Sequence, residues 1–160
     1  MPNIQIREAT IEDSSLIVQF VKELAAFERA PSEATVTVED IQKSIFAADP
    51  NVHALFCCIN EEPVGFAVYF YNYSTWLGKN GLYLEDLYVT PKYRGRGAGK
   101  TLLKHLAKIA VSKDCGRFEL SVLDWNEPAI KFYESIGAKP QSEWIVYRLE
   151  GETLRDFARG

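Results

Sequence analysis

The run from Val89 to Thr101 combines glycine and basic residues in a pattern that suits an anionic ligand. Its glycines are Gly95, Gly97 and Gly99, and the basic residues among them are Arg94, Arg96 and Lys100. Glycine lets the backbone approach a ligand closely and adopt positive φ angles. The run follows a strand-like segment and precedes a helical one, so the free N–H groups of a helix N-terminus point into it. We therefore expect this loop to hold a phosphate or pyrophosphate group.

Two familiar nucleotide-binding patterns do not fit this run. Gly99-Lys100-Thr101 matches the end of a Walker A motif, but that motif needs a glycine where Arg94 stands. A dinucleotide-binding fingerprint needs the spacing G-x-G-x-x-G, whereas these glycines are evenly spaced. A solvated loop without any ligand remains the structural alternative.

Two adjacent carboxylates, Glu85 and Asp86, lie in the apolar segment that enters this loop. A carboxylate there is suited to bind an alkylammonium, whose pKa resembles that of lysine at ~10.4, and to receive its proton directly or through water. Neighbouring residues of a regular strand point to opposite faces, which makes Asp86 the weaker candidate. A salt bridge at the strand edge is the alternative role for Glu85.

A phenol on a later helix offers a complementary acid. The run from Asn126 to Pro128 predicts the start of a helix that continues to Ile136, with Gly137 in the usual stop position. Phe132 and Tyr133 both lie on this helix, and periodicity does not say which of them faces the core. A phenol with a pKa of ~10 keeps its proton at neutral pH and can donate it as a general acid.

The remaining pattern predicts the elements that position these groups. Strands are expected at Asn3–Arg7, Val52–Ile59, Val64–Tyr71, Leu82–Val89, Phe118–Leu123 and Trp144–Leu149, the last followed by a polar tail. Helices are expected from a capping-box start at Thr10–Asp13 to before Pro31, near Thr37 with Asp40 three residues on, around Leu102–Ala110 and from Asn126 to Ile136, and Asn72–Gly81 is expected as a polar loop. A βαβ stretch that follows a meander implies a mixed sheet with helices on both faces.

The composition is that of an ordinary globular domain. The chain has 160 residues, which fits one domain over 1–160, and a net charge of −4, which disfavours broad nucleic-acid binding. Cys57, Cys58 and Cys115 form no CxxC pair and are expected as reduced thiols. The charged residues near the N-terminus exclude the apolar stretch of a signal peptide, so we expect a cytoplasmic protein. His53 and His105 are isolated, and no metal is expected.

The spacing Arg94-x-x-Gly97-x-Gly99 resembles the pyrophosphate loop of the GNAT acetyltransferase superfamily. Further segments resemble its spermidine/spermine and thialysine N-acetyltransferase branch: Lys22–Leu24, Phe27-Glu28, Ser74–Lys79, Tyr83–Val89, Tyr93–Gly95, Asp124–Pro128 and Phe132-Tyr133. The resemblance covers nearly the whole chain. It implies the GNAT fold, which is an α/β (mixed α+β) fold with a central, mostly antiparallel, twisted sheet of about seven strands.

The resemblance also implies an activity and a set of site residues. The activity is acetyl-CoA-dependent acetylation of a primary amine on a small polyamine, diamine or lysine-like compound, by direct transfer in a ternary complex. Glu85 is expected at the reacting amine, and Tyr133 is expected as the acid that protonates the coenzyme A thiolate. The residues expected at the amine are Phe27, Glu28, Glu85 and Glu143. The residues expected at coenzyme A are Leu87, Tyr88, Val89, Arg94, Gly95, Arg96, Gly97, Ala98, Gly99, Lys100, Asn126, Glu127, Pro128, Ala129 and Tyr133.

Several alternatives stay open at this stage. The backbone N–H groups of Leu87 to Val89 are expected to polarise the thioester, while Asn126 could equally be only an N-cap. An acyl-enzyme on Cys57 or Cys115 is the less favoured mechanism. Acetylation of a protein lysine or N-terminus and a non-catalytic coenzyme A sensor are the competing functions. The resembled branch further implies a homodimer.

Overall fold

The computed structural model describes residues 3–160, which divide into two compact units. The first unit extends to Ser121, and the second runs from Val122 to Gly160. Among the described residues, no helix combines the length and the apolar character needed to cross a membrane.

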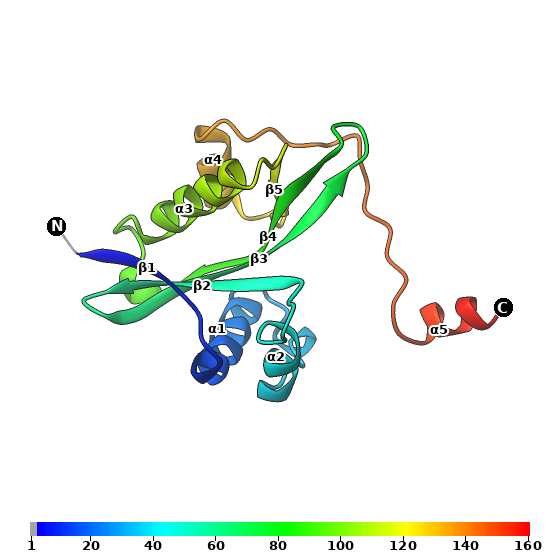
Figure 1. Cartoon of the computed structure of the whole chain (residues 1–160), viewed down its shortest axis with the longest axis horizontal. Helices are drawn as coiled ribbons and strands as arrows, with labels where there is room; N and C mark the ends of the chain where they lie inside the picture. Colours follow the sequence, from blue (N-terminus) through cyan, green and yellow to red (C-terminus); the bar gives the residue numbers. More distant parts are fainter. Residues whose placement is uncertain (1–2) are drawn as a thin grey trace. The chain divides into compact units, whose positions relative to one another are not determined.

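The first unit is built on a sheet that, within residues 3–121, contains five strands in the order β1-β2-β3-β4-β5 (Figure 1). The strands are β1 (Ile4–Glu8), β2 (Val52–Ile59), β3 (Glu62–Ser74), β4 (Lys79–Val89) and β5 (Phe118–Leu120). Neighbouring strands are antiparallel except β4 and β5, which are parallel. The predicted mixed, mostly antiparallel sheet is therefore confirmed.

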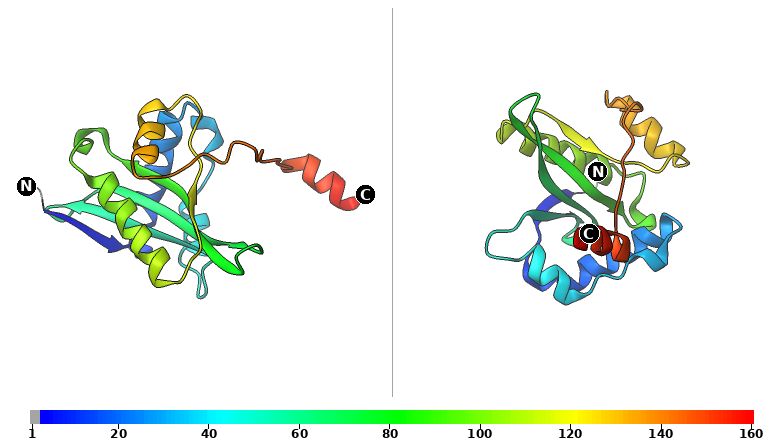
Figure 2. Two further views of the ribbon diagram at one scale, coloured as in Figure 1. Left: turned by 90° about the horizontal axis from the view of Figure 1, so that it is seen from above. Right: turned by 90° about the vertical axis from the view of Figure 1, so that its right-hand side faces the viewer.

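Helices cover both faces of this sheet, as Figures 1 and 2 show. Helices α1 (Ser14–Phe27) and α2 (Val38–Ser44) lie on one face, and α3 (Ala98–Ser112) lies on the other. The α1 face buries one apolar cluster with Phe20, Phe56 and Phe66 at its centre. Alternate residues of β2 point to the opposite face, where Leu102 and Leu106 of α3 are fully buried. Apolar side chains are therefore buried on both faces of the sheet.

Side-chain caps mark the start of the 3-10 turn at Ile11–Asp13, which leads directly into α1, and the start of α2. The Asp13 carboxylate accepts from the Thr10 backbone N–H at 2.8 Å, and the Asp40 carboxylate accepts from the Thr37 N–H at 2.9 Å. Each pair forms a capping box, which satisfies N–H groups that the helix itself leaves free. Arg7 of β1 also donates two hydrogen bonds to Asp13, at 2.8 and 3.0 Å. These contacts confirm the predicted helix starts.

The β3–β4 hairpin is longer than predicted. Residues expected as a polar loop continue the ladder in the pairs Asn72↔Gly81, Tyr73↔Asn80 and Ser74↔Lys79. The prediction was wrong because this part of the ribbon is largely exposed, so its side chains are polar and carry no core pattern. The β2–β3 turn, in contrast, is the expected tight hairpin, with positive φ angles at Asn60 and Glu61.

The second unit contains two helices, α4 (Glu127–Ser135) and α5 (Gly151–Arg159). The described residues 144–149 form no strand, which corrects the prediction for Trp144–Leu149 and leaves the sheet short of the expected seven strands. Val146 and Tyr147 are 85% and 90% exposed. β-propensity reports how well a residue fits a half-buried sheet surface and does not itself supply a pairing partner.

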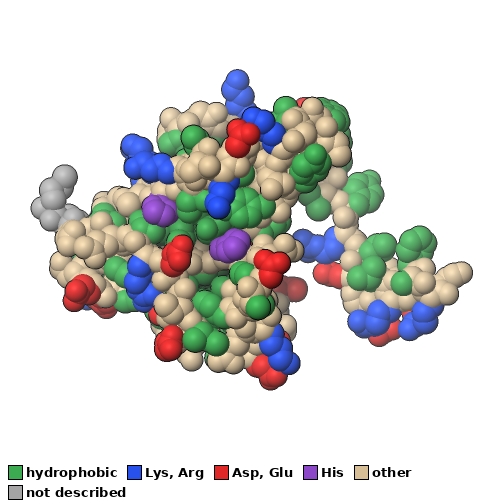
Figure 3. All heavy atoms as spheres, viewed as in Figure 1, with side chains coloured by type: hydrophobic (Ala, Val, Ile, Leu, Met, Phe, Trp, Pro, Cys, Tyr) green, Lys and Arg blue, Asp and Glu red, His purple; other side chains and the backbone are tan. Residues whose placement is uncertain are grey.

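The predicted polar tail is instead the amphipathic helix α5. Figure 3 shows its apolar side chains gathered on one side and its charged side chains on the other. Arg155 pairs with Glu152 at 2.6 Å, and Arg159 pairs with Asp156. These i,i+3 pairs support a helix whose apolar residues, Leu154 and Phe157, are exposed. The segment is short and mostly charged, so its two large apolar residues do not form a clear helical pattern in the sequence.

Candidate functional site

Strand β4 carries its two adjacent carboxylates at a β-bulge. Asp86 pairs with Val68 and Leu84 pairs with Tyr69, which leaves Glu85 as the extra residue between them. A bulge interrupts the alternation of side chains and re-aims them. Asp86 consequently shares a face with its partner Val68, which belongs to the apolar cluster beneath α1. The strand is therefore not regular at these two carboxylates, as the comparison of Glu85 with Asp86 had assumed it to be.

Three carboxylates interact at this bulge, and we call Glu28, Glu85 and Asp86 the carboxylate cluster. Glu28 caps the C-terminus of α1. Burial, and then the negative charge of Glu85, raise the pKa of Glu28. Burial and then the charges of Glu85 and Glu28 raise the pKa of Asp86 to about 6. Like charges held this close favour a bound cation, because a cation relieves their mutual repulsion.

The glycine-rich loop begins where β4 ends. The Thr90 N–H donates to the Val64 carbonyl oxygen at 2.8 Å, and a single 3-10 turn at Pro91–Tyr93 follows. Gly95 and Gly97 have φ angles of 77° and 87°, a conformation that disfavours any side chain with a Cβ. Gly97 is the N-cap of α3, so the first N–H groups of that helix lack intrahelical acceptors.

The other predicted loop residues have different surroundings. Ala98 is buried, with 2% of its surface exposed, and anchors the start of α3. A Cβ at Gly99 would lie 3.9 Å from its nearest neighbour, Val89 Cγ2. A residue with a Cβ would therefore fit at this position without a clash within the protein. Arg96 lies over the Tyr93 ring at 5.2 Å, and Lys100 is exposed on the first turn of α3. The loop therefore exposes cationic groups around a backbone that glycine shapes.

Arg94 does not extend from the loop. Its Nε donates to the Val89 carbonyl oxygen at 2.8 Å. Its guanidinium carbon lies 4.9 Å from the centre of the Phe27 ring and 5.5 Å from that of the Tyr88 ring. The structure thus brings together Phe27, predicted at the amine, and Arg94, predicted at the cofactor.

The end of β4 has a free edge next to the loop. Among the described residues, β4 pairs with β5 only from Leu82 to Leu84. Leu87, Tyr88 and Val89 pair with β3 alone, opposite Ala67, Phe66 and Gly65. On the side of β4 away from β3, residues 87–89 therefore have no strand partner within residues 3–121.

The second unit carries the remaining predicted residues. The Asn126 side chain accepts from the Ala129 N–H at 3.4 Å, so its role as an N-cap is confirmed. Glu127 and Pro128 form the first turn of α4. The rings of Phe132 and Tyr133 lie 5.7 Å apart and both are half-buried. Glu143 is exposed in the segment before Trp144.

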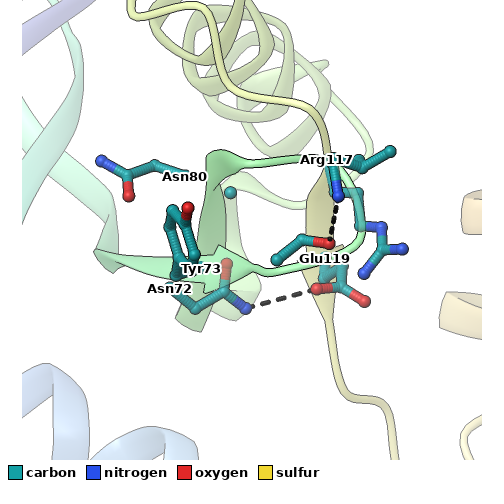
Figure 4. A pocket seen from close by; sticks show the side chains of 8 residues that line it. Asn72, Tyr73, Asn80, Arg117 and Glu119 are labelled. Atoms are coloured by element: carbon teal, nitrogen blue, oxygen red, sulfur yellow. Dashed lines mark hydrogen bonds between the residues drawn. The ribbon is translucent and has the colours of Figure 1, made fainter.

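A small polar hollow lies at the far end of the β3–β4 hairpin (Figure 4). It is lined by Asn72, Tyr73, Asn80, Arg117 and Glu119, among others, and the Asn72 amide donates to Glu119 at 3.3 Å. Its volume of about 10 Å³ accommodates no more than a water molecule. This hollow is too small for the predicted ligands.

Thiol chemistry and metal chemistry find little support in the described residues. Cys57 is fully buried, and burial raises the pKa of its thiol to about 11. Burial also raises the pKa of Cys115. Because the thiolate is the nucleophile, these shifts disfavour an acyl-enzyme. No group of three or more His, Cys, Asp or Glu in residues 3–160 is arranged to hold a metal ion.

Comparison with known proteins decides the family. Residues 18–138 match the family model described as the Acetyltransferase (GNAT) family. The chain belongs to this family. It is an enzyme that acts as an N-acetyltransferase, and its mixed α/β architecture is the GNAT fold.

Individual relatives place this acetyltransferase within the family. It is 38% identical to the thialysine N-epsilon-acetyltransferase of Mus musculus, over 99% of both chains. It is 36% identical to the spermidine/spermine N(1)-acetyltransferase-like protein 1 of Homo sapiens, over 99% of this chain and 24% of that protein. An integron cassette protein from the mobile metagenome of V. cholerae has a similar structure, with a TM-score of 0.82, 28% identity and 98% of each chain covered. The resemblance to this branch is therefore confirmed.

Sequence reasoning gave one side chain near the site a lower rank and did not single out another. Asp86 was ranked below Glu85 because no sequence signal marks the bulge. Glu23 was not singled out, yet it accepts a hydrogen bond from the Tyr88 hydroxyl at 2.8 Å. The sequence placed Glu23 and Phe27 four residues apart on one predicted helix, which puts them on the same face. That spacing was the available signal for Glu23.

Proposed function

We propose that this acetyltransferase transfers the acetyl group of acetyl-CoA to a primary amine of a small polyamine, diamine or lysine-like compound such as thialysine. The observation that carries the proposal is the bulge in β4. It brings Glu85 and Asp86 toward the end of α1 on the strand that leads directly into the glycine-rich loop. The proposed cation-binding carboxylates therefore lie on the strand that leads into the proposed anion-binding loop.

The proposed chemistry is direct transfer in a ternary complex. Glu85 takes a proton from the ammonium, directly or through water, so that the amine nitrogen can attack the thioester carbonyl carbon. N–H groups at Leu87 to Val89 stabilise the oxyanion of the tetrahedral intermediate. As the carbon–sulfur bond breaks, the Tyr133 hydroxyl gives its proton to the departing thiolate, and the nitrogen releases its second proton, which passes through water to the tyrosinate. The products are the acetylated amine and free coenzyme A.

The loop residues supply the proposed binding of the donor. The N–H groups at the start of α3 and the side chains of Arg96 and Lys100 face the pyrophosphate, where helix dipole and charge act together. Ala98 holds the turn in place, and Gly95 and Gly97 allow the backbone to approach. Residues Asn126 to Ala129, at the start of α4, are proposed as further residues that bind the donor.

The substrate class follows from the carboxylate cluster. Two or more carboxylates suit a compound with more than one ammonium group, and the exposed ring of Phe27 suits its methylene chain. Glu143 is proposed as a further carboxylate for the distal ammonium. The names of the relatives, which refer to thialysine and to spermidine/spermine, support the same class.

The test is an amine panel with acetyl-CoA, in which thiol release is followed with spermidine, putrescine, thialysine, lysine and a histone peptide. Release with one or more of the small amines is expected. Release with the peptide alone would reassign the enzyme to protein acetylation. Coenzyme A binding by calorimetry without thiol release from any amine would indicate a non-catalytic sensor.

We further propose that residues 1–160 act as a single catalytic domain in a cytoplasmic homodimer. Alignment of the mouse relative over 99% of both chains supports one functional domain. The exposed apolar residues between Ile145 and Leu149 support self-association, because such surface is usually covered in solution. Sedimentation equilibrium at several concentrations tests the dimer, and a monomer at every concentration would contradict it.

A further inference from the structure

The guanidinium of Arg94 is held between two aromatic rings from different elements. Phe27 is the last residue of α1, and Tyr88 lies near the end of β4. Their ring centres lie 4.9 and 5.5 Å from the guanidinium carbon. Both distances are within the ~6 Å range of a cation–π contact. Arg94 is thus restrained by α1 as well as by its own loop.

Polar contacts fix the other parts of this arrangement. The Nε of Arg94 donates to the Val89 carbonyl oxygen at 2.8 Å, which closes the chain from 89 to 94 into a ring. The Tyr88 hydroxyl donates to Glu23 of α1 at 2.8 Å, and burial and this carboxylate raise the pKa of Tyr88 to about 12. The phenol therefore keeps its proton and remains a donor. Tyr88 is held to α1 at one end and to Arg94 at its ring.

The same end of α1 reaches the carboxylate cluster. Glu28 follows Phe27 directly in the chain, and its charge interacts with that of Glu85. Of these two adjacent residues, Phe27 therefore contacts the glycine-rich loop through Arg94, and Glu28 lies at the proposed amine site. A displacement of the end of α1 moves both side chains together.

We propose that Phe27 is a positioning residue that holds Arg94 and thereby couples the binding of the acetyl donor to the binding of the amine. This inference rests on the proposed function. Phe27 was expected to contact only the amine, and its contact with Arg94 gives it a second task. Occupancy of either site orders the end of α1 and so favours the other ligand, and such coupling is reciprocal.

The first experiment measures the effect of Phe27 on donor binding without amine. Phe27→Leu removes the ring but keeps an apolar side chain, and Phe27→Tyr keeps the ring. By calorimetry, Phe27→Leu weakens coenzyme A binding about two- to five-fold, the ratio that corresponds to an exposed cation–π contact. Phe27→Tyr restores binding to within twofold of the wild type. Phe157→Leu, which changes another exposed phenylalanine at a helix end, is the matched control.

The second experiment separates positioning of the loop from a general loss of structure. Acetyl-CoA and acetyl-pantetheine carry the same thioester, but only acetyl-CoA has the pyrophosphate. Phe27→Leu lowers kcat/KM for acetyl-CoA relative to acetyl-pantetheine by the same two- to five-fold. An equal fall for both donors would overturn the proposal, since it would place the effect at the amine or in the fold.

The third experiment measures the coupling itself. The dissociation constant of spermidine or thialysine is determined with and without saturating coenzyme A, which has no acetyl group to transfer. In the wild type, coenzyme A lowers the dissociation constant of the amine. In Phe27→Leu, the ratio of the dissociation constants without and with coenzyme A falls toward one. An unchanged ratio in Phe27→Leu would overturn the coupling. A wild-type protein that binds no coenzyme A would instead overturn the proposed function, so the two failures are distinguishable.

Discussion

The glycine-rich loop follows strand β4 and the carboxylate cluster lies at the bulge within it, and the proposed function gives them opposite charges to recognise by different means. The loop is proposed to bind an anion through its backbone, because Gly95 and Gly97 have positive φ angles and the N-terminus of α3 follows them. The cluster is proposed to bind a cation through side chains, because Glu85 is the extra residue of a bulge and its charge interacts with those of Asp86 and Glu28. Side-chain changes are therefore expected to affect the amine strongly, whereas the loop is sensitive to changes in backbone geometry.

The largest effect is expected from Glu85→Gln. The amide keeps the shape of the side chain but cannot accept the proton of the ammonium, so kcat falls by about 10²–10⁴-fold. Activity then rises only as the pH approaches the pKa of the free amine, ~10. A pH–rate profile measures this shift, while the affinity for coenzyme A stays near the wild-type value. An unchanged profile would remove Glu85 from the proposed chemistry.

Tyr133→Phe is expected to lower turnover by about 10²-fold, because the thiolate leaves without a proton donor. The ring remains, so its packing beside Phe132 and the affinity for coenzyme A are retained. Steady-state kinetics gives the turnover number, and calorimetry on the same preparation gives the dissociation constant of coenzyme A. Phe132→Leu is the matched control, since it changes the neighbouring ring without touching the hydroxyl. Turnover close to that of the wild type in Tyr133→Phe would contradict the assignment.

The backbone of the loop is tested by Gly97→Ala. A residue with a Cβ pays ~1–2 kcal/mol to hold the left-handed conformation of Gly97, so the dissociation constant of coenzyme A rises about tenfold. Gly99→Ala adds the same methyl group where the nearest atom is 3.9 Å away, and a much smaller rise is expected. Calorimetry compares the two variants. Equal effects would mean that steric exclusion, rather than backbone strain, governs the loop.

The smallest effect is expected from Asp86→Asn, and it depends on pH. Burial and the charges of Glu85 and Glu28 raise the pKa of Asp86 to about 6, so the folded state holds this proton more tightly than the unfolded chain. The contribution of Asp86 to stability is therefore lost as the pH rises from about 4 to about 6. Asp86→Asn removes this loss, so the free energy of unfolding of the variant falls less than that of the wild type between pH about 4 and about 6.

In the proposed function, we also expect Asp86 to affect amine binding. A deprotonated Asp86 attracts the ammonium, so the affinity of the wild type for the amine rises by about five-fold, or ~1 kcal/mol, as the pH passes through about 6. Asp86→Asn flattens this rise. Urea denaturation and calorimetry at several pH values check both expectations, and parallel curves for wild type and variant would contradict them.

Much of the first unit could be predicted because local signals agree with tertiary packing there. The capping boxes at Thr10 and Thr37 mark helix starts, and the apolar run Val52–Ile59 is a strand that is largely buried. The loop from Arg94 to Lys100 was predicted from glycine spacing, because glycine is needed where φ is positive.

The remaining differences arise where the outcome depends on pairing partners rather than on local pattern. The bulge at Glu85 is a property of the β3–β4 register, and Leu84, Glu85 and Asp86 in the sequence give no sign of it. Residues 144–149 have the composition of a strand, but a ladder needs a second strand. The Phe27–Arg94 contact joins residues 67 positions apart in the chain, a distance that no periodicity reports.

The extra residue in β4 is needed for the proposed catalysis but not for the pairing of β3 with β4. Without Glu85, Leu84 and Asp86 would become chain neighbours opposite Tyr69 and Val68, which are already neighbours, so the register would close without a gap. A single codon deletion would then spare the hydrogen-bonded architecture and abolish acetylation. Such a deletion variant would be an inert scaffold that differs from the working enzyme by one amino acid.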